Sequence, residues 1–140
     1  AGGTLSASTV AMGMAPPAVA DRLAQELVSV CRTAIGDDLR SITYFTAESH
    51  DQLYLREDLD PEANVEAFVA NERLGFASQD TYGDTELGDY LFTIRVFEWG
   101  YLTRTIAGAH GVFVTTDPLD MAEFKEVGTS VRTVLEGTGD

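Results

Sequence analysis

The sequence predicts an α+β domain in which three helices cover a five-stranded antiparallel sheet, with the element order α-β-β-α-β-β-β-α. Residues 89–117 are rich in Val, Ile, Thr, Phe and Tyr and are interrupted twice by glycine, which is typical of three strands joined by turns. Three other stretches carry apolar residues at spacings of three and four, which is typical of helices with one buried side. A sheet of five strands needs cover on at least one face, and three helices can supply it.

The first helix is expected over residues 17–35. Pro16 and Pro17 fit its first turn, because proline lacks the backbone N–H that would have no partner there, and Gly36 is the expected stop. Cys31 is the single cysteine, so it cannot form an internal disulfide and is expected to be a buried thiol. The apolar side of this helix consists of Val19, Leu23, Leu27, Val30, Cys31, Ala34 and Ile35.

Residues 39–46 and 52–57 predict a β-hairpin whose turn contains Glu48, His50 and Asp51. These three side chains offer oxygen and nitrogen donors, but a zinc site normally needs three or four converging ligands. We therefore expect a solvated turn, and no metal or cofactor site is predicted in the chain.

Two Asp-Pro pairs predict where the second and third helices begin. Asp60 and Asp117 can each cap a helix whose first turn holds the following proline. The second helix is expected to end near Gly75, and residues 77–88 then form a long polar connection. Gly128 lies inside the third helix, where glycine is unfavourable by about 1 kcal/mol relative to alanine. We expect a neighbouring element to pack closely against it.

The chain length fits one domain, expected over residues 16–140, after a flexible tail of residues 1–15. The tail has neither the basic start nor the long apolar core of a signal peptide, so a cytoplasmic protein is expected. No stretch approaches about 18 uninterrupted apolar residues, so no membrane span is expected.

The charge balance excludes one class of partner. The chain has 23 acidic and 9 basic residues, a net charge of −14, and Lys125 as its single lysine. Nucleic-acid binding needs cationic groups that displace counterions from phosphates, so no such partner is expected. The composition resembles that of small acidic proteins from salt-accumulating haloarchaea, in which carboxylates keep the surface hydrated in molar salt. Binding of a basic partner is the alternative explanation for the acidity.

The element order and the length resemble the roadblock family of small regulatory domains, and more loosely the longin and profilin-like folds. The resemblance covers roughly residues 17–137. It implies a homodimer joined through sheet edges, and a non-enzymatic role as a scaffold or as a regulator of a partner such as a small GTPase. An uncovered edge of the sheet, with its row of unpaired backbone groups, is therefore the first candidate binding site.

Four side chains in the predicted meander are tentative ligand or partner contacts: His110, Arg104, Arg95 and Trp99. His110 stands between Gly108 and Gly111, where a turn would leave the imidazole exposed. The two glycines can supply positive φ angles or close backbone approach without any ligand. Trp99 could form an exposed aromatic patch or pack under a helix end.

Arg95 and Arg104 lie on predicted strands of a chain that is short of cations. Alternation puts Arg104 on one face with Leu102 and Ile106. Arginine's planar fork suits an anionic ligand, but ion pairs with Glu57 or Glu98 are the simpler expectation for these strand arginines, Arg56 among them.

Two functions of different class follow. The first is a non-enzymatic regulatory or scaffold domain that acts through homodimerisation or partner binding. The second is a sensor of a small anionic metabolite, similar to PAS or GAF domains, with a pocket lined by Tyr44 or Arg104. No nucleophile elbow or phosphate loop is present, so no enzyme is expected.

Overall fold

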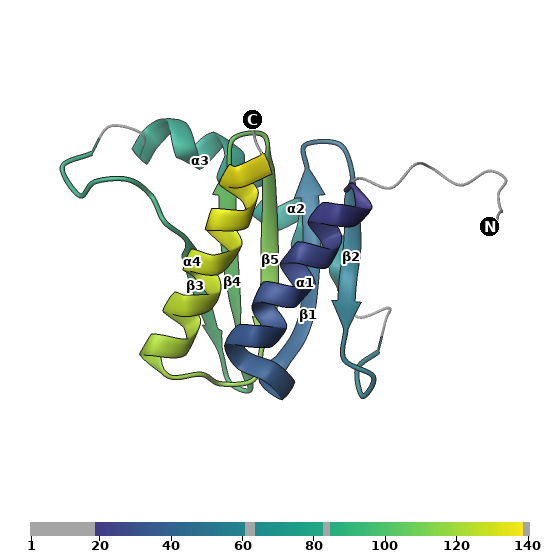
Figure 1. Cartoon of the computed structure of the whole chain (residues 1–140). Helices are drawn as coiled ribbons and strands as arrows, with labels where there is room; N and C mark the ends of the chain where they lie inside the picture. The colour runs from purple at the N-terminus through teal and green to yellow at the C-terminus, as the bar shows by residue number, and fades with distance from the viewer. Residues whose placement is uncertain (1–18, 61–63, 83–84, 139–140) are drawn as a thin grey trace, which may run out of the picture.

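A computed structural model describes residues 19–60, 64–82 and 85–138, and Figure 1 shows the whole chain. Among the described residues, no helix has both the length and the apolar character needed to cross a membrane. The elements are α1 (Asp21–Ile35), η1 (Gly36–Asp38), β1 (Leu39–Thr46), β2 (His50–Leu55), α2 (Val65–Glu72), α3 (Leu74–Tyr82), β3 (Thr93–Phe97), β4 (Gly100–Ala107), β5 (His110–Thr116) and α4 (Met121–Thr138).

The five strands form one antiparallel sheet in the order β2-β1-β5-β4-β3, which confirms the predicted fold class. β1 and β5 are adjacent in the middle of the sheet although they lie far apart in the sequence, and β2 and β3 are the outer strands. β1 has the predicted bounds, whereas β2 begins two residues earlier than predicted, at His50. The predicted turns of the meander fall between β3, β4 and β5 as expected.

Helices cover both faces of the sheet. α1 and α4 lie side by side over one face, and α2 lies behind the sheet on the other (Figure 1). Because successive side chains of a strand point to opposite faces, Val112 and Val114 pack in the core under α1 and α4. Phe113 packs with Phe45 and Val69 in a smaller core under α2.

The first helix ends where the sequence predicts but begins later than predicted, at Asp21, because Ala20 has an extended backbone. α1 ends at Ile35, and Gly36 follows with φ 55°, a backbone conformation that favours glycine. Cys31 is fully buried, and burial raises the pKa of its thiol to about 12. The prolines expected in the first turn and the predicted tail of residues 1–15 lie outside the described residues.

The second helical region differs from the prediction. α2 begins at Val65, later than the predicted start, and Pro61 lies outside the described residues. The chain does not leave the helical region near Gly75 but continues as α3 into the predicted loop. Two contacts explain the continuation: the ring of Phe76 packs on Phe45 with centroids 5.5 Å apart, and Gly75 lies directly against the Arg104 guanidinium. A side chain at residue 75 would overlap that guanidinium, so the glycine serves close packing rather than a stop.

The third predicted helix, α4, is capped by Asp120 and not by Asp117. The Glu123 backbone N–H donates to Asp120 Oδ1 at 2.8 Å, and the Asp120 N–H donates to Glu123 Oε1 at 3.0 Å, which is a reciprocal capping box. Asp117 therefore has no capping role and is used in an ion-pair network described below.

The close packing expected at Gly128 is confirmed. A Cβ built on Gly128 would lie 2.5 Å from a ring carbon of Phe92, the residue that precedes β3. We expect Gly128→Ala to lower the free energy of unfolding by about 1–2 kcal/mol, because overpacking costs about 1–3 kcal/mol and alanine returns up to about 1 kcal/mol of helix propensity. Urea unfolding followed by circular dichroism measures the change.

Gly137→Ala is the matched control, because a Cβ at Gly137 of the same helix has no neighbour within 4 Å. We expect this variant to be at least as stable as the parent. Equal effects of the two substitutions would contradict a steric role for Gly128.

Candidate functional site

Four exposed apolar side chains lie on β3 or within two residues of its ends, and we call them the β3 patch: Leu91, Val96, Phe97 and Trp99. They make up four of the eight large hydrophobic side chains that are exposed in the described part of the chain. Trp99 is 79% exposed and Val96 is 70% exposed. Trp99 thus belongs to an aromatic patch and does not pack under a helix end. Soluble proteins usually protect an outer strand with charges or proline, so an apolar outer strand indicates an interaction surface.

The other outer strand is different. All residues of β2 are half-buried, and none of the exposed large hydrophobic side chains lies on it. At its two ends β2 is tied to the rest of the fold: Asp51 accepts a hydrogen bond from the Val19 backbone at 3.1 Å, and Arg56 joins an ion-pair network. Of the two edges, β3 is therefore the better candidate for docking another chain.

A buried carboxylate supports the β3 edge from behind. Glu72 of α2 is only 2% exposed, and it accepts hydrogen bonds from Arg95 Nε at 2.7 Å and from Arg104 Nη1 at 3.2 Å. Arg95 lies on β3 and Arg104 on β4, so one carboxylate joins α2 to both strands. The predicted ion pairs of these arginines with Glu57 or Glu98 are wrong, because the partner comes from a helix that packs over their face.

Further contacts fix Arg104 in place. Its Nη2 donates to Thr93 Oγ1 at 2.9 Å, and the Tyr90 hydroxyl donates to the Arg104 carbonyl at 3.1 Å. Arg104 shares its face with Leu102 and Ile106, as the alternation predicted. Hydrogen bonding to Glu72 raises the pKa of Arg95. Both guanidinium groups are thus committed to a protein carboxylate, and the arrangement holds the two strands rather than presenting a cationic site.

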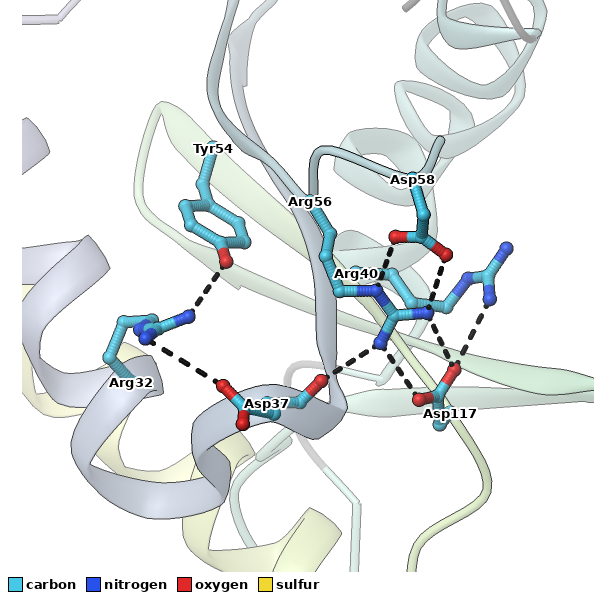
Figure 2. Close-up of polar contacts among 7 residues, drawn as sticks. All are labelled: Arg32, Asp37, Arg40, Tyr54, Arg56, Asp58 and Asp117. Atoms are coloured by element: carbon cyan, nitrogen blue, oxygen red, sulfur yellow. Dashed lines mark hydrogen bonds and ion pairs between the residues drawn. The ribbon is translucent and has the colours of Figure 1, made fainter. Parts of the chain in front are cut away.

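A second ion-pair network lies where β1 begins and where its neighbours β2 and β5 end. Figure 2 shows Asp117 between the guanidinium groups of Arg40 and Arg56. Arg56 donates to Asp117 Oδ2 at 2.8 Å, to Asp58 Oδ1 at 2.7 Å and to the Asp37 carbonyl at 2.8 Å, while Arg40 donates to Asp117 Oδ1 at 3.2 Å. The network joins β1, β2 and β5 through residues on or directly after those strands.

These contacts shift the acid–base properties of the network. The hydrogen bond from Arg56 holds the pKa of Asp117 below its ordinary value, with help from Arg40, although burial opposes the shift. The same guanidinium lowers the pKa of Asp58, and its bonds to the two carboxylates raise the pKa of Arg56. The cluster is therefore fully ionised at neutral pH.

The structure places His110 away from both networks. It is the first residue of β5, half-buried, and its Nδ1 lies 3.0 Å from the hydroxyl of Tyr44, so the imidazole is not the unencumbered group that the sequence predicted. The flanking glycines act as expected, because Gly108 has φ 63° and Gly111 lies where a Cβ would meet the Phe45 ring. Within the described residues, no group of three or more His, Cys, Asp or Glu is placed to hold a metal ion.

The structure thus brings Arg95 and Arg104 together through Glu72 and places Trp99 at the β3 edge, while His110 stands apart. Leu91, Val96 and Phe97 were not among the candidate contacts predicted from the sequence. Their apolar character is equally typical of core residues, and only the strand order shows that β3 is an outer strand.

One family model matches most of the chain. Residues 25–136 match the model described as a domain of unknown function, DUF7522. The chain belongs to the DUF7522 family. No curated protein sequence matches this DUF7522 domain.

Solved structures share its fold. The gliding protein MglB from Thermus thermophilus is 13% identical, with a TM-score of 0.53, and the match covers 88% of this chain and 99% of that chain. Myxococcus xanthus MglB is 11% identical, with a TM-score of 0.56 and coverage of 87% and 96%. An MglB with a tetrameric arrangement is 13% identical, with a TM-score of 0.56 and coverage of 89% and 100%. These matches confirm the predicted roadblock-like fold.

Glu72→Gln tests the buried carboxylate. The substitution leaves Arg104 buried without a counter-charge, so we expect the free energy of unfolding to fall by about 3–5 kcal/mol. Glu66→Gln, at an exposed position of the same helix, is the control and should change stability by less than about 0.5 kcal/mol. Chemical unfolding measures the stability of both variants. A Glu72→Gln variant as stable as its control would contradict a stabilising role for the ion pairs of Glu72.

Asp117→Asn tests the second network through its pH dependence. Because the folded-state pKa of Asp117 lies below the unfolded-state value of about 3.9, its ion pairs stabilise the fold above that pH, and this stabilisation is lost as the pH falls through the folded-state pKa. We expect the variant to lose about 1–3 kcal/mol at pH 7. Below about pH 4 the difference from the parent should shrink.

Thermal melts between about pH 2 and pH 7 follow this convergence. Asp37→Asn is the control, because the Asp37 side chain is fully exposed and its pair with Arg32 spans 3.9 Å. A destabilisation by Asp117→Asn that stays constant over the whole pH range would rule out the ionic contribution.

Proposed function

We propose that this domain is a non-catalytic regulatory or scaffold module that associates with a second copy of itself through the β3 edge. The observation that carries the proposal is the β3 patch on an outer strand of the sheet. An added strand would satisfy the outward backbone groups of β3 and remove the patch from water. The tetrameric arrangement of one MglB with the same fold supports self-association.

Symmetry favours one geometry for this pairing. In a two-fold dimer the same surface meets itself, so an antiparallel β3–β3 pair has a residue of β3 at its centre. A centre at Arg95 brings Leu91 of one protomer level with Trp99 of its partner, and sets Val96 opposite the partner's Ile94. In the same register Phe97 lies opposite the partner's Thr93. Each Arg95 keeps its own Glu72 as a counter-charge.

The charge distribution supports a protein partner and a salt-rich cytoplasm. Within the described residues, six of the nine basic side chains form ion pairs with carboxylates, so the remaining surface is strongly acidic: the paired residues are Arg32, Arg40, Arg56, Arg95, Arg104 and Arg132. Such a surface repels nucleic acid and stays hydrated in concentrated salt. The roadblock-like fold makes a small GTPase the first heterologous partner to test.

Val96→Asp tests the dimer. The substitution puts a charge into the centre of the pairing surface of each protomer, and we expect association to weaken by at least about 30-fold, equivalent to about 2 kcal/mol. Light scattering coupled to size exclusion, in molar KCl and over a range of protein concentrations, should show a dimer for the parent and a monomer for the variant. An unchanged circular dichroism spectrum confirms that the variant is folded.

Leu74→Asp is the matched control, because Leu74 is 67% exposed but lies on α3 and not in the β3 patch. This variant should remain a dimer. A parent protein that is monomeric at every concentration, or a dimer that is lost equally in both variants, would contradict association through β3.

A further inference from the structure

A cavity of about 490 Å³ lies on the face of the sheet that α2 covers, next to the first turn of this helix. Its walls come from all five strands, from the first turn of α2 and from residues shortly after β2. They are mainly apolar, and their apolar side chains include Leu55, Leu59, Val65, Phe68, Leu102 and Phe113. Pockets for small molecules typically have volumes of ~300–1,000 Å³ and apolar walls with a few polar groups, so this cavity has the size and character of a binding site.

Polar groups lie at one side of the cavity. The hydroxyls of Ser41 and Thr115, on the adjacent strands β1 and β5, are 2.5 Å apart, and the amide of Gln52 lies on the neighbouring strand β2. One hydroxyl hydrogen suffices for the bond between Ser41 and Thr115, so the second remains available as a donor. The amide supplies both donors and an acceptor. These groups match a hydroxyl, carbonyl or amide of a ligand.

The charges around the cavity disfavour an anion. Arg40 is the cationic side chain in its wall, and it already donates to Asp117 at 3.2 Å. Asp60 and Glu98 also line the cavity, and the whole chain carries a net charge of −14. An anionic ligand would meet this negative field, and the charge of Arg40 is already balanced by a carboxylate. The walls instead suit a molecule that is uncharged.

We propose that this cavity binds an uncharged amphipathic molecule, such as a lipid-like alcohol or amide, with its apolar body against Val65, Phe68 and Phe113 and its polar end at Ser41, Thr115 and Gln52. The cavity is formed within one chain, so the proposal does not depend on the β3 dimer. Phe97 and Trp99 also line it. A bound ligand would therefore contact these two residues of the β3 patch.

Trp99 offers a direct readout, because it is the only tryptophan of the chain. The neutral fluorophore N-phenyl-1-naphthylamine, titrated into the full-length protein, should become fluorescent and quench Trp99 by energy transfer. The anionic dye 1-anilinonaphthalene-8-sulfonate should bind at least tenfold more weakly. Absence of Trp99 quenching by the neutral probe, or tighter binding of the anionic dye, would overturn the proposal.

Cavity-filling variants locate the probe. Val65→Phe and Leu59→Phe each add volume inside the cavity, and each should weaken probe binding at least tenfold while thermal unfolding confirms a folded protein. Ala70→Phe is the matched control, since Ala70 is an exposed residue of the same helix outside the cavity, and it should bind the probe like the parent. Equal affinity for the probe in the filled variants and the control would show that the cavity is not the site.

Val96→Asp separates the cavity from the β3 patch. Val96 belongs to the patch but does not line the cavity, so this variant should retain probe binding. Loss of binding in Val96→Asp together with full binding in Val65→Phe would assign the probe to the exposed patch and reject the cavity.

Discussion

The outer half of the sheet depends on one buried charge, the carboxylate of Glu72. β3 is a short strand that pairs with β4 alone, and an outer strand of five residues gains little stability from its own backbone bonds. Glu72 connects this strand and β4 to α2 through Arg95 and Arg104. Removing Glu72 would leave the buried Arg104 without a counter-charge, whereas removing either arginine leaves Glu72 paired with the other.

The network around Asp117 joins the strands of the other half of the sheet. Arg56 and Arg40 share Asp117, which ties the ends of β2, β1 and β5 together. In a chain with few cations, both networks use arginine, whose planar guanidinium can satisfy two acceptors at once. Arg95 and Arg104, which the sequence suggested as tentative ligand or partner contacts, pair with Glu72 and join β3 and β4 to α2.

A sheet with one apolar edge and a nearby apolar cavity suits a protein that acts by binding. The β3 patch and the cavity share Phe97 and Trp99, so an occupant of either one lies close to the other. Coupling between two such sites requires only that a ligand favours one position of the shared side chains. His110 and Tyr44, at the opposite end of β5, lie apart from this region.

How much of the fold the sequence predicts varies between elements for physical reasons. The strands were predictable because β-branched and aromatic residues concentrate there, and glycines mark the turns. α3 was missed because its apolar residues do not recur at a helical spacing. It is held in the fold by Phe76 on Phe45 and by Gly75 on Arg104, which are contacts between segments distant in the chain. The predicted start of α4 was wrong because the sequence contains two aspartates that could cap this helix. Asp120 caps it, whereas Asp117 forms ion pairs with Arg40 and Arg56.

The candidate site was predictable only in outline. The resemblance of the element order to roadblock domains pointed to a sheet edge, and the sequence alone determined the α+β class, the five strands, the buried thiol of Cys31 and the acidic surface. Which edge is apolar, and which carboxylate pairs with Arg95 and Arg104, was decided by the tertiary structure. Local patterns fix the face to which a side chain points, but the neighbour it meets there depends on the order of the strands and on the helix that packs over them.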